Sequence, residues 1–163
     1  MNIRKAKIED LNELAEIELL CFPVEEAASK ESIKNRLIVY PDHFWVMEDE
    51  GKIIAYVNGM STNEPILRDE MFEDASLHQE DGNWQMIFSV STRPEYRNRG
   101  VAQAILNQVI AETKELNRKG LVLTCKDRLV HYYEKFGFVN EGISSSTHGS
   151  AIWYDMRLEF TGE

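Results

Sequence analysis

The order of its predicted elements indicates an α/β protein with a sheet of mixed strand direction and helices on both faces. Two observations predict this class: a β-rich hairpin comes early in the chain, and the later strands alternate with helices. At 163 residues the chain can also bury roughly 70% of its unfolded surface around one core. We therefore expect residues 1–163 to form a single domain.

The first third of the chain predicts a strand, two helices and a hairpin. Helical spacing of apolar residues stops at Cys21-Phe22-Pro23, and a second helical run begins at the capping residue Ser29. Asp49-Glu50-Gly51 separates two β-rich runs, which is typical of an antiparallel hairpin. The predicted ranges are a strand over residues 2–8, helices over 9–20 and 29–39, and the β-rich runs 43–48 and 52–60.

Residues 63–82 show no clear periodicity and contain seven acidic residues and one arginine. A loop of this length in a compact domain is usually functional or mobile. Two interpretations stay open at this point, a solvated surface insertion and a lid over a substrate. Its carboxylates would favour a cationic ligand over an anionic one.

The second half predicts strands that alternate with helices. Pro94 ends a strand, Gly100 precedes a long amphipathic helix, and Gly137 is placed to end a shorter one. A turn around residues 147–150 and the alternating run after it predict a closing hairpin. The predicted ranges are strands over 84–92, 121–124 and 151–160, and helices over 101–116 and 127–136.

Composition and charge exclude several partners. A net charge of -10 offers no basic surface for nucleic acid or for an anionic membrane. No apolar run approaches the roughly 20 residues that span a bilayer, so we expect a cytoplasmic protein with no membrane association. Cys21 and Cys125 lack neighbours at metal-ligand spacing, and we expect no metal site.

The basic loop STRPEYRNRG between a strand and a long helix predicts an anion site. Unpaired N–H groups and the positive dipole end of the first helical turn both attract an anion, and Gly100 lets the backbone approach it. The same loop also fits solvated arginines around a turn glycine. Residues expected to hold a pyrophosphate are Arg97, Asn98, Arg99, Gly100, Val101 and Ala102.

Two segments resemble the GNAT superfamily of N-acyltransferases. RNRGVA resembles its R/Q-x-x-G-x-G/A acetyl-coenzyme A signature, and LVHYYEKFGFVNEG resembles the helix and strand that end in Y-x-x-x-G-F. The resemblance covers residues 2–160 and is closest to the arylalkylamine (serotonin-type) N-acetyltransferases and their bacterial relatives. It implies the GNAT fold, with a mixed, mostly antiparallel sheet, and acetyl-CoA as cosubstrate.

The resemblance also implies roles for individual residues. The strand carrying Val90, Ser91 and Thr92 would pair with the pantetheine arm of acetyl-CoA, and Gln103 would join the pyrophosphate loop. Tyr133 would be the general acid that protonates the departing thiolate. A tyrosine simply packed on the apolar face of its helix is the alternative interpretation.

The proton acceptor is where the chain departs from the arylalkylamine pattern. Two histidines of that group correspond to Met86 and Phe88 here, and neither side chain can accept a proton. The alternatives are Glu25 and Glu26 between the first two helices, His78 in the acidic insertion, and a water chain. His131 falls on a different helix face from Tyr133 and is not paired with it.

Three functions follow as expectations. The first is transfer of an acetyl group from acetyl-CoA to a small, cationic primary amine. The second is acetylation of a protein or peptide amine, and the third is a catalytically silent module that binds acyl-CoA. Similar proteins are commonly homodimers, so a homodimer is an open expectation.

Overall fold

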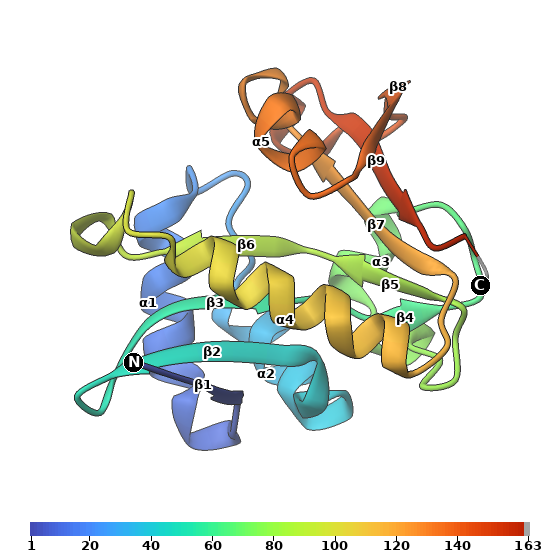
Figure 1. Cartoon of the computed structure of the whole chain (residues 1–163). Coiled ribbons are helices and arrows are strands. Elements are labelled where there is room, and N and C mark those ends of the chain that lie inside the picture. The colour runs from blue at the N-terminus through green and yellow to red at the C-terminus, as the bar shows by residue number, and fades with distance from the viewer. Residues whose placement is uncertain (162–163) are drawn as a thin grey trace.

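The computed structural model describes residues 1–161 and contains two β-sheets with helices packed around them (Figure 1). None of the helices within those residues combines the length and the apolar character that crossing a membrane requires. The helices are α1 (Leu11–Cys21), α2 (Lys30–Val39), α3 (Asp69–Glu73), α4 (Val101–Glu115) and α5 (Val130–Glu134). The strands are β1 (Asn2–Lys5), β2 (Phe44–Asp49), β3 (Lys52–Asn58), β4 (Ser61–Thr62), β5 (Trp84–Ile87), β6 (Ser89–Thr92), β7 (Gly120–Cys125), β8 (Val139–Ile143) and β9 (Tyr154–Glu159).

The strands pair mainly in antiparallel fashion. One sheet has the order β1-β2-β3-β6, and every neighbouring pair in it is antiparallel. The other has the order β4-β5-β7-β9-β8, in which β5 and β7 are parallel and the remaining pairs antiparallel. The prediction of a mixed, mostly antiparallel sheet with helices on both faces is confirmed.

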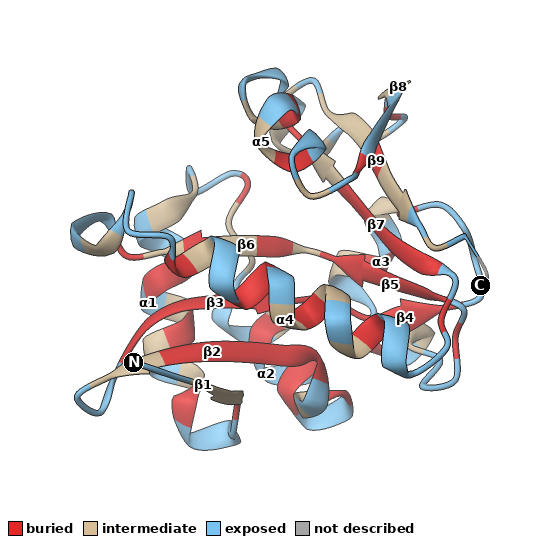
Figure 2. Ribbon diagram, in the orientation of Figure 1, coloured by how far each residue is buried: buried red, intermediate tan, exposed pale blue. Residues whose placement is uncertain are grey.

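Two hydrophobic clusters lie on opposite faces of the first sheet. Along β2, Phe44 and Val46 belong to the cluster beneath α1 and α2, whereas Trp45 and Met47 belong to the cluster beneath α4. This alternation follows from the two-residue period of a strand. Figure 2 shows β2 and β3 buried along most of their length between these layers.

The predicted strand over residues 84–92 is two strands that belong to different sheets. The backbone N–H of Phe88, the residue between β5 and β6, donates to the Asn58 carbonyl at 2.7 Å. β5 pairs with β7 through Ile87 and Leu123, and beyond this point β6 pairs with β3 instead. Consequently β6 and β7 diverge, as Figure 1 shows, and a gap in the backbone pairing opens between them.

The acidic insertion, predicted to be irregular, contains α3 and a short 3-10 turn over residues 75–77. Arg68, at the N-terminal end of α3, forms ion pairs with Glu64 at 2.9 Å and Glu70 at 2.6 Å. Met71 is fully buried in the cluster beneath α1 and α2. The insertion is therefore packed on the domain through an apolar residue of α3.

The C-terminal predictions need smaller corrections. The helix predicted over 127–136 is a 3-10 turn followed by the shorter α5. The closing strand is β9, which begins three residues later than predicted because 148–150 form a 3-10 turn before it. β9 pairs with β8 and with β7, so the predicted hairpin is present with a long connection, residues 144–153.

Candidate functional site

A cavity of about 970 Å³ lies where β6 and β7 diverge. One end of it is lined by the loop before α4 and by the first residues of that helix. Its middle is lined by β6, the end of β7 and α5, and its other end by the α1–α2 connection, α3 and the 144–153 connection. The cavity thus joins the predicted anion site to the predicted acid.

The end of the cavity at the predicted anion site is formed by a loop that turns sharply into α4. Asn98 and Gly100 have φ of 63° and 76°, a left-handed conformation that favours glycine and asparagine. Gly100 is the N-cap of the 15-residue α4, so the free N–H groups of the first turn and the positive helix end face this loop. The loop residues that line the cavity are Arg97, Asn98, Gly100, Val101, Ala102 and Gln103.

Arg99 and Ser91 are not among the lining residues. The Arg99 guanidinium lies over the Tyr96 ring, 5.3 Å from its centroid. Ser91 is buried opposite Tyr56 on β3. Val90 and Thr92 both line the cavity, because no strand within residues 1–161 pairs with β6 on this side and alternate residues direct their backbone groups to that edge. The Thr92 carbonyl there accepts from the Cys21 thiol and from Arg97 Nε, each at 3.2 Å.

Tyr133 lies in the middle of the cavity, on α5, with 7% of its surface exposed. Burial raises the pKa of Tyr133 above that of an ordinary phenol, and neighbouring Tyr132 and Cys125 raise it further. The ring contacts Tyr132 and Phe138 edge to face. The hydroxyl therefore stays protonated at neutral pH, which is the state a proton donor requires.

The far end of the cavity combines aromatic rings with carboxylates. The Phe72 and Phe88 rings lie 4.5 Å apart, and the His148 ring stacks on Phe72 at 5.5 Å. Two cations, Arg36 and Lys126, also line this end. The aromatic and acidic residues there are Phe22, Phe72, Phe88, Trp153, Glu18, Glu25, Glu26 and Glu73.

Two of these carboxylates already have strong partners. Glu18 is buried, and it accepts from the Tyr56 hydroxyl at 2.5 Å and from the Ala28 N–H at 2.9 Å. Glu26 is buried and forms an ion pair with Lys126 at 2.9 Å. These contacts hold the α1–α2 connection against the sheet.

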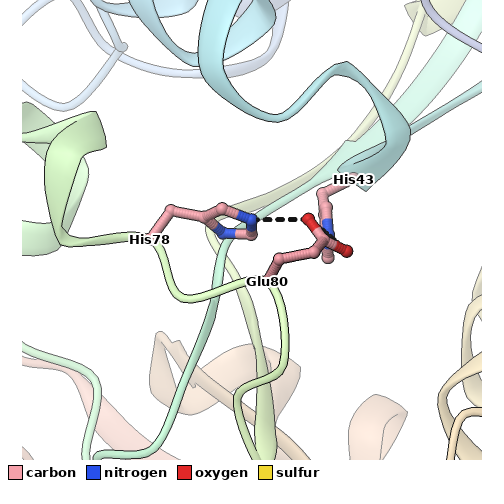
Figure 3. A group of neighbouring side chains, drawn as sticks. All are labelled: His43, His78 and Glu80. Carbon is pink, nitrogen blue, oxygen red and sulfur yellow. Dashed lines mark hydrogen bonds and ion pairs between the residues drawn. The ribbon is translucent and has the colours of Figure 1, made fainter.

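Of the sequence-predicted proton acceptors, Glu25 and Glu26 line the cavity and His78 does not. His78 lies with His43 and Glu80 in a separate cluster (Figure 3). Its Nε2 is 2.8 Å from Glu80, and its Nδ1 accepts from the Ser61 N–H at 3.2 Å. His131 is 95% exposed at its side chain and pairs with Glu134, as expected for a residue turned away from Tyr133.

The His43, His78 and Glu80 cluster is the group with metal-ligand geometry among residues 1–161, since its ligand atoms lie within 4.8 Å of one another. Hydrogen bonds connect the three side chains. Because Ser61 donates to Nδ1 of His78, the other ring nitrogen carries the proton and donates to Glu80. Burial lowers the pKa of His43, although Glu80 acts to raise it.

Sequence reasoning missed His148 as a cavity residue. Its Nε2 lies 2.7 Å from the backbone oxygen of Glu26, and its own backbone oxygen accepts from the Trp153 indole at 2.8 Å. The partners lie 122 and 5 residues away along the chain. No local pattern could have signalled the longer contact; the one signal was a histidine in a glycine-containing turn.

The first comparison identifies the family. Residues 11–138 match the model of the acetyltransferase (GNAT) family. The chain belongs to this family. Serotonin N-acetyltransferase from Mesocricetus auratus is 24% identical over 128 residues, which cover 78% of this chain and 60% of that relative. The chain thus spans less than two thirds of the length of this GNAT relative.

Solved structures of GNAT proteins share the fold. The loading GNATL domain of CurA from Lyngbya majuscula superposes with a TM-score of 0.84 at 18% identity, over 97% of this chain and 96% of that one. The GphF GNAT-like decarboxylase in complex with isobutyryl-CoA gives a TM-score of 0.83 at 21% identity, over 98% and 99% of the two chains. The predicted GNAT fold is confirmed, and at these identities the likeness extends to the fold alone.

Proposed function

We propose that this GNAT protein transfers an acetyl group from acetyl-CoA to the nitrogen of a primary amine. The observation that carries the proposal is a cavity that connects the loop before α4, the outer edge of β6 and Tyr133. A related fold is known in complex with isobutyryl-CoA. The loop, β6 and Tyr133 would each serve one step of the reaction.

The pyrophosphate of acetyl-CoA would bind the N–H groups of the loop and first turn of α4, with Arg97 beside it. The pantetheine amides would pair with the backbone of Val90 and Thr92, as an added strand does at a sheet edge. This arrangement would bring the thioester to the middle of the cavity. Tyr133 would then protonate the departing thiolate.

The acceptor we propose is a small, cationic amine. Two exposed carboxylates, Glu25 and Glu73, line the far end of the cavity and support a positively charged ligand. The aromatic rings of Phe72, Phe88 and Trp153 support an apolar substituent on it. We further propose that residues 1–163 form a single domain. The two free cysteines support our proposal that this domain is cytoplasmic.

Release of the coenzyme A thiol tests the proposal. The protein and acetyl-CoA are mixed with arylalkylamines, polyamines, aminoglycosides or short peptides, and thiol is followed with a colour reagent. We expect one class of small amine to drive release. Tyr133→Phe should lower kcat by about 100-fold while leaving the affinity for CoA within twofold.

Tyr154→Phe is the matched control, because Tyr154 lies on β9 outside the cavity lining. It should keep the wild-type rate. If only peptides drive thiol release, the acceptor is a protein or peptide amine and not a small amine. CoA binding measured by calorimetry, together with no thiol release by any amine, would instead indicate the silent acyl-CoA-binding module.

A further inference from the structure

We propose that His148 is the general base that removes the proton from the acceptor amine. The inference rests on the proposed function above and assigns the step for which Met86 and Phe88 offer no acceptor. His148 lines the far end of the cavity from the 144–153 connection, a part of the chain distant from the strand where the related enzymes carry their histidines.

The hydrogen bond to Glu26 fixes which ring nitrogen can act. The Glu26 backbone oxygen only accepts, so His148 Nε2, 2.7 Å away, carries the proton. A neutral imidazole has one N–H, and the lone pair therefore lies on Nδ1. Within residues 1–161 this Nδ1 has no hydrogen-bond partner, and it is not enclosed by protein atoms.

Three contacts hold the imidazole and the turn that carries it. The Trp153 indole donates to the His148 backbone oxygen at 2.8 Å, and the Phe72 ring stacks on the imidazole with an interplanar angle of 17°. Ser146 donates its hydroxyl to Asp69 at the start of α3, at 2.6 Å. The acidic insertion thus anchors the turn that presents His148, which favours a positioned group over a solvated one.

The other histidines do not reach the cavity. All four histidines of the chain lie within the described residues, and His148 is the one that lines it. His43 and His78 use both ring nitrogens in hydrogen bonds to Gln85, Glu80 and the Ser61 backbone.

The carboxylates at this end are poorer bases. Glu18 and Glu26 are engaged with Tyr56 and Lys126. Glu25 and Glu73 are exposed, and an exposed side chain is not held in one position toward a bound amine.

Several charged groups bear on the charge of His148. Glu26 and Lys126 form the ion pair next to its hydrogen bond, and Asp69 holds the turn below it. Glu73 on α3 and Arg36 on α2 line the same end of the cavity. These groups include three carboxylates and two cations.

The step balances as follows. The ammonium gives one proton to Nδ1 of His148, and the neutral amine attacks the thioester carbon, forming a C–N bond. The C–S bond then breaks, and the thiolate takes the proton of the Tyr133 hydroxyl. The nitrogen loses its second proton, which restores the phenol, and the imidazolium releases its proton to solvent. The products are the amide, the CoA thiol and one proton.

The kinetic test compares His148→Gln with wild type, using the amine that releases most thiol. Gln can still donate to the Glu26 oxygen, but it cannot accept a proton. We expect kcat/KM at pH 7 to fall about 100-fold and to recover as pH rises and the free amine accumulates. Imidazole should partly restore the activity of His148→Ala. A His148→Gln variant with wild-type rates from pH 6 to 9 would overturn the proposal.

The matched control is His131→Gln, which removes an exposed imidazole paired with Glu134. It should keep the wild-type pH profile. Loss of activity in both variants would overturn the assignment to His148.

A second readout does not depend on turnover. Side-chain 15N–1H correlation spectra of histidine-labelled protein with bound CoA report the tautomer of each ring. We expect neutral His148 to carry its proton on Nε2 at pH 8. A proton on Nδ1 would overturn the inference even where acetyl transfer proceeds, whereas failed transfer with the expected tautomer would count against the proposed function alone.

Discussion

A Cβ atom on Gly149 would lie 2.5 Å from Cγ of Glu26. The residue after His148 must therefore lack a side chain for the turn to reach the Glu26 backbone. Gly149 also has φ of 61°, a conformation that costs other residues about 1 kcal/mol. The same glycine thus satisfies both the turn and the close approach.

Gly149→Ala should lower kcat/KM for the amine by about tenfold or more, because the turn and Glu26 must separate and displace His148. The free energy of unfolding should fall by only about 1–2 kcal/mol. Gly51→Ala is the control, since Gly51 has φ of 80° and no heavy atom within 4 Å of the added Cβ. It should lose similar stability and keep full activity. Equal activity of Gly149→Ala and Gly51→Ala would contradict the proposal that the turn over residues 148–150 places His148 for catalysis.

The sequence predicted most elements but not the break at Phe88. Residues 84–92 contain neither glycine nor proline, and their composition suits one continuous strand. The chain changes its pairing partner at Phe88, because β5 pairs with β7 and β6 pairs with β3. A change of partner depends on segments distant in sequence, so local composition does not report it.

Short elements and long-range contacts account for the other differences. α3 has five residues, too few for a periodic pattern, and is kept helical by the burial of Met71 and by the ion pairs of Arg68. That the glycine-containing basic loop and Tyr133 line one cavity could be predicted, because both lie in local motifs, whereas their roles in binding and catalysis stay predictions. His148 could not, because its role depends on Glu26, 122 residues away.

Arg97 and Arg99 should contribute unequally to CoA binding. Arg97 lines the cavity, whereas the Arg99 guanidinium lies over Tyr96. Arg97→Ala should raise the Kd for CoA about tenfold, which corresponds to about 1.4 kcal/mol. Arg99→Ala removes the same charge and should change the Kd less than threefold. Calorimetric titration with CoA measures both, and equal losses would indicate a diffuse electrostatic effect in place of a contact.

Cys125 should be an unreactive thiol. Burial raises the pKa of Cys125 to about 11, and the nearby Asp127 charge adds to the effect. At pH 8 its thiolate fraction is then roughly 100-fold smaller than that of an ordinary cysteine thiol. Mass spectrometry after iodoacetamide treatment should show slow alkylation of Cys125 in the folded protein and rapid alkylation in urea. Equal rates in the two states would contradict the burial of the thiol.

Asp10 should make the fold sensitive to acid. Burial acts to raise the pKa of Asp10, but hydrogen bonds from Arg4 at 2.8 Å and from the Lys7 N–H at 2.7 Å outweigh it and lower the pKa below its usual value. A carboxyl group with a lowered folded-state pKa stabilises the protein above its unfolded pKa, near 4. That stabilisation is lost as pH falls through the folded-state pKa.

Asp10→Asn should therefore unfold more easily at pH 7, by about 1–3 kcal/mol, because the Arg4 guanidinium and the Lys7 N–H lose a charged acceptor. Its free energy of unfolding should also change less than that of wild type between pH 5 and 3. Urea titrations at each pH measure both effects, with the exposed Asp127→Asn as control. If the free energy of unfolding of both variants depends on pH as that of wild type does, the Asp10 carboxylate does not stabilise the start of α1. This pH dependence reports how much more the ionised carboxyl group stabilises the fold than the protonated one.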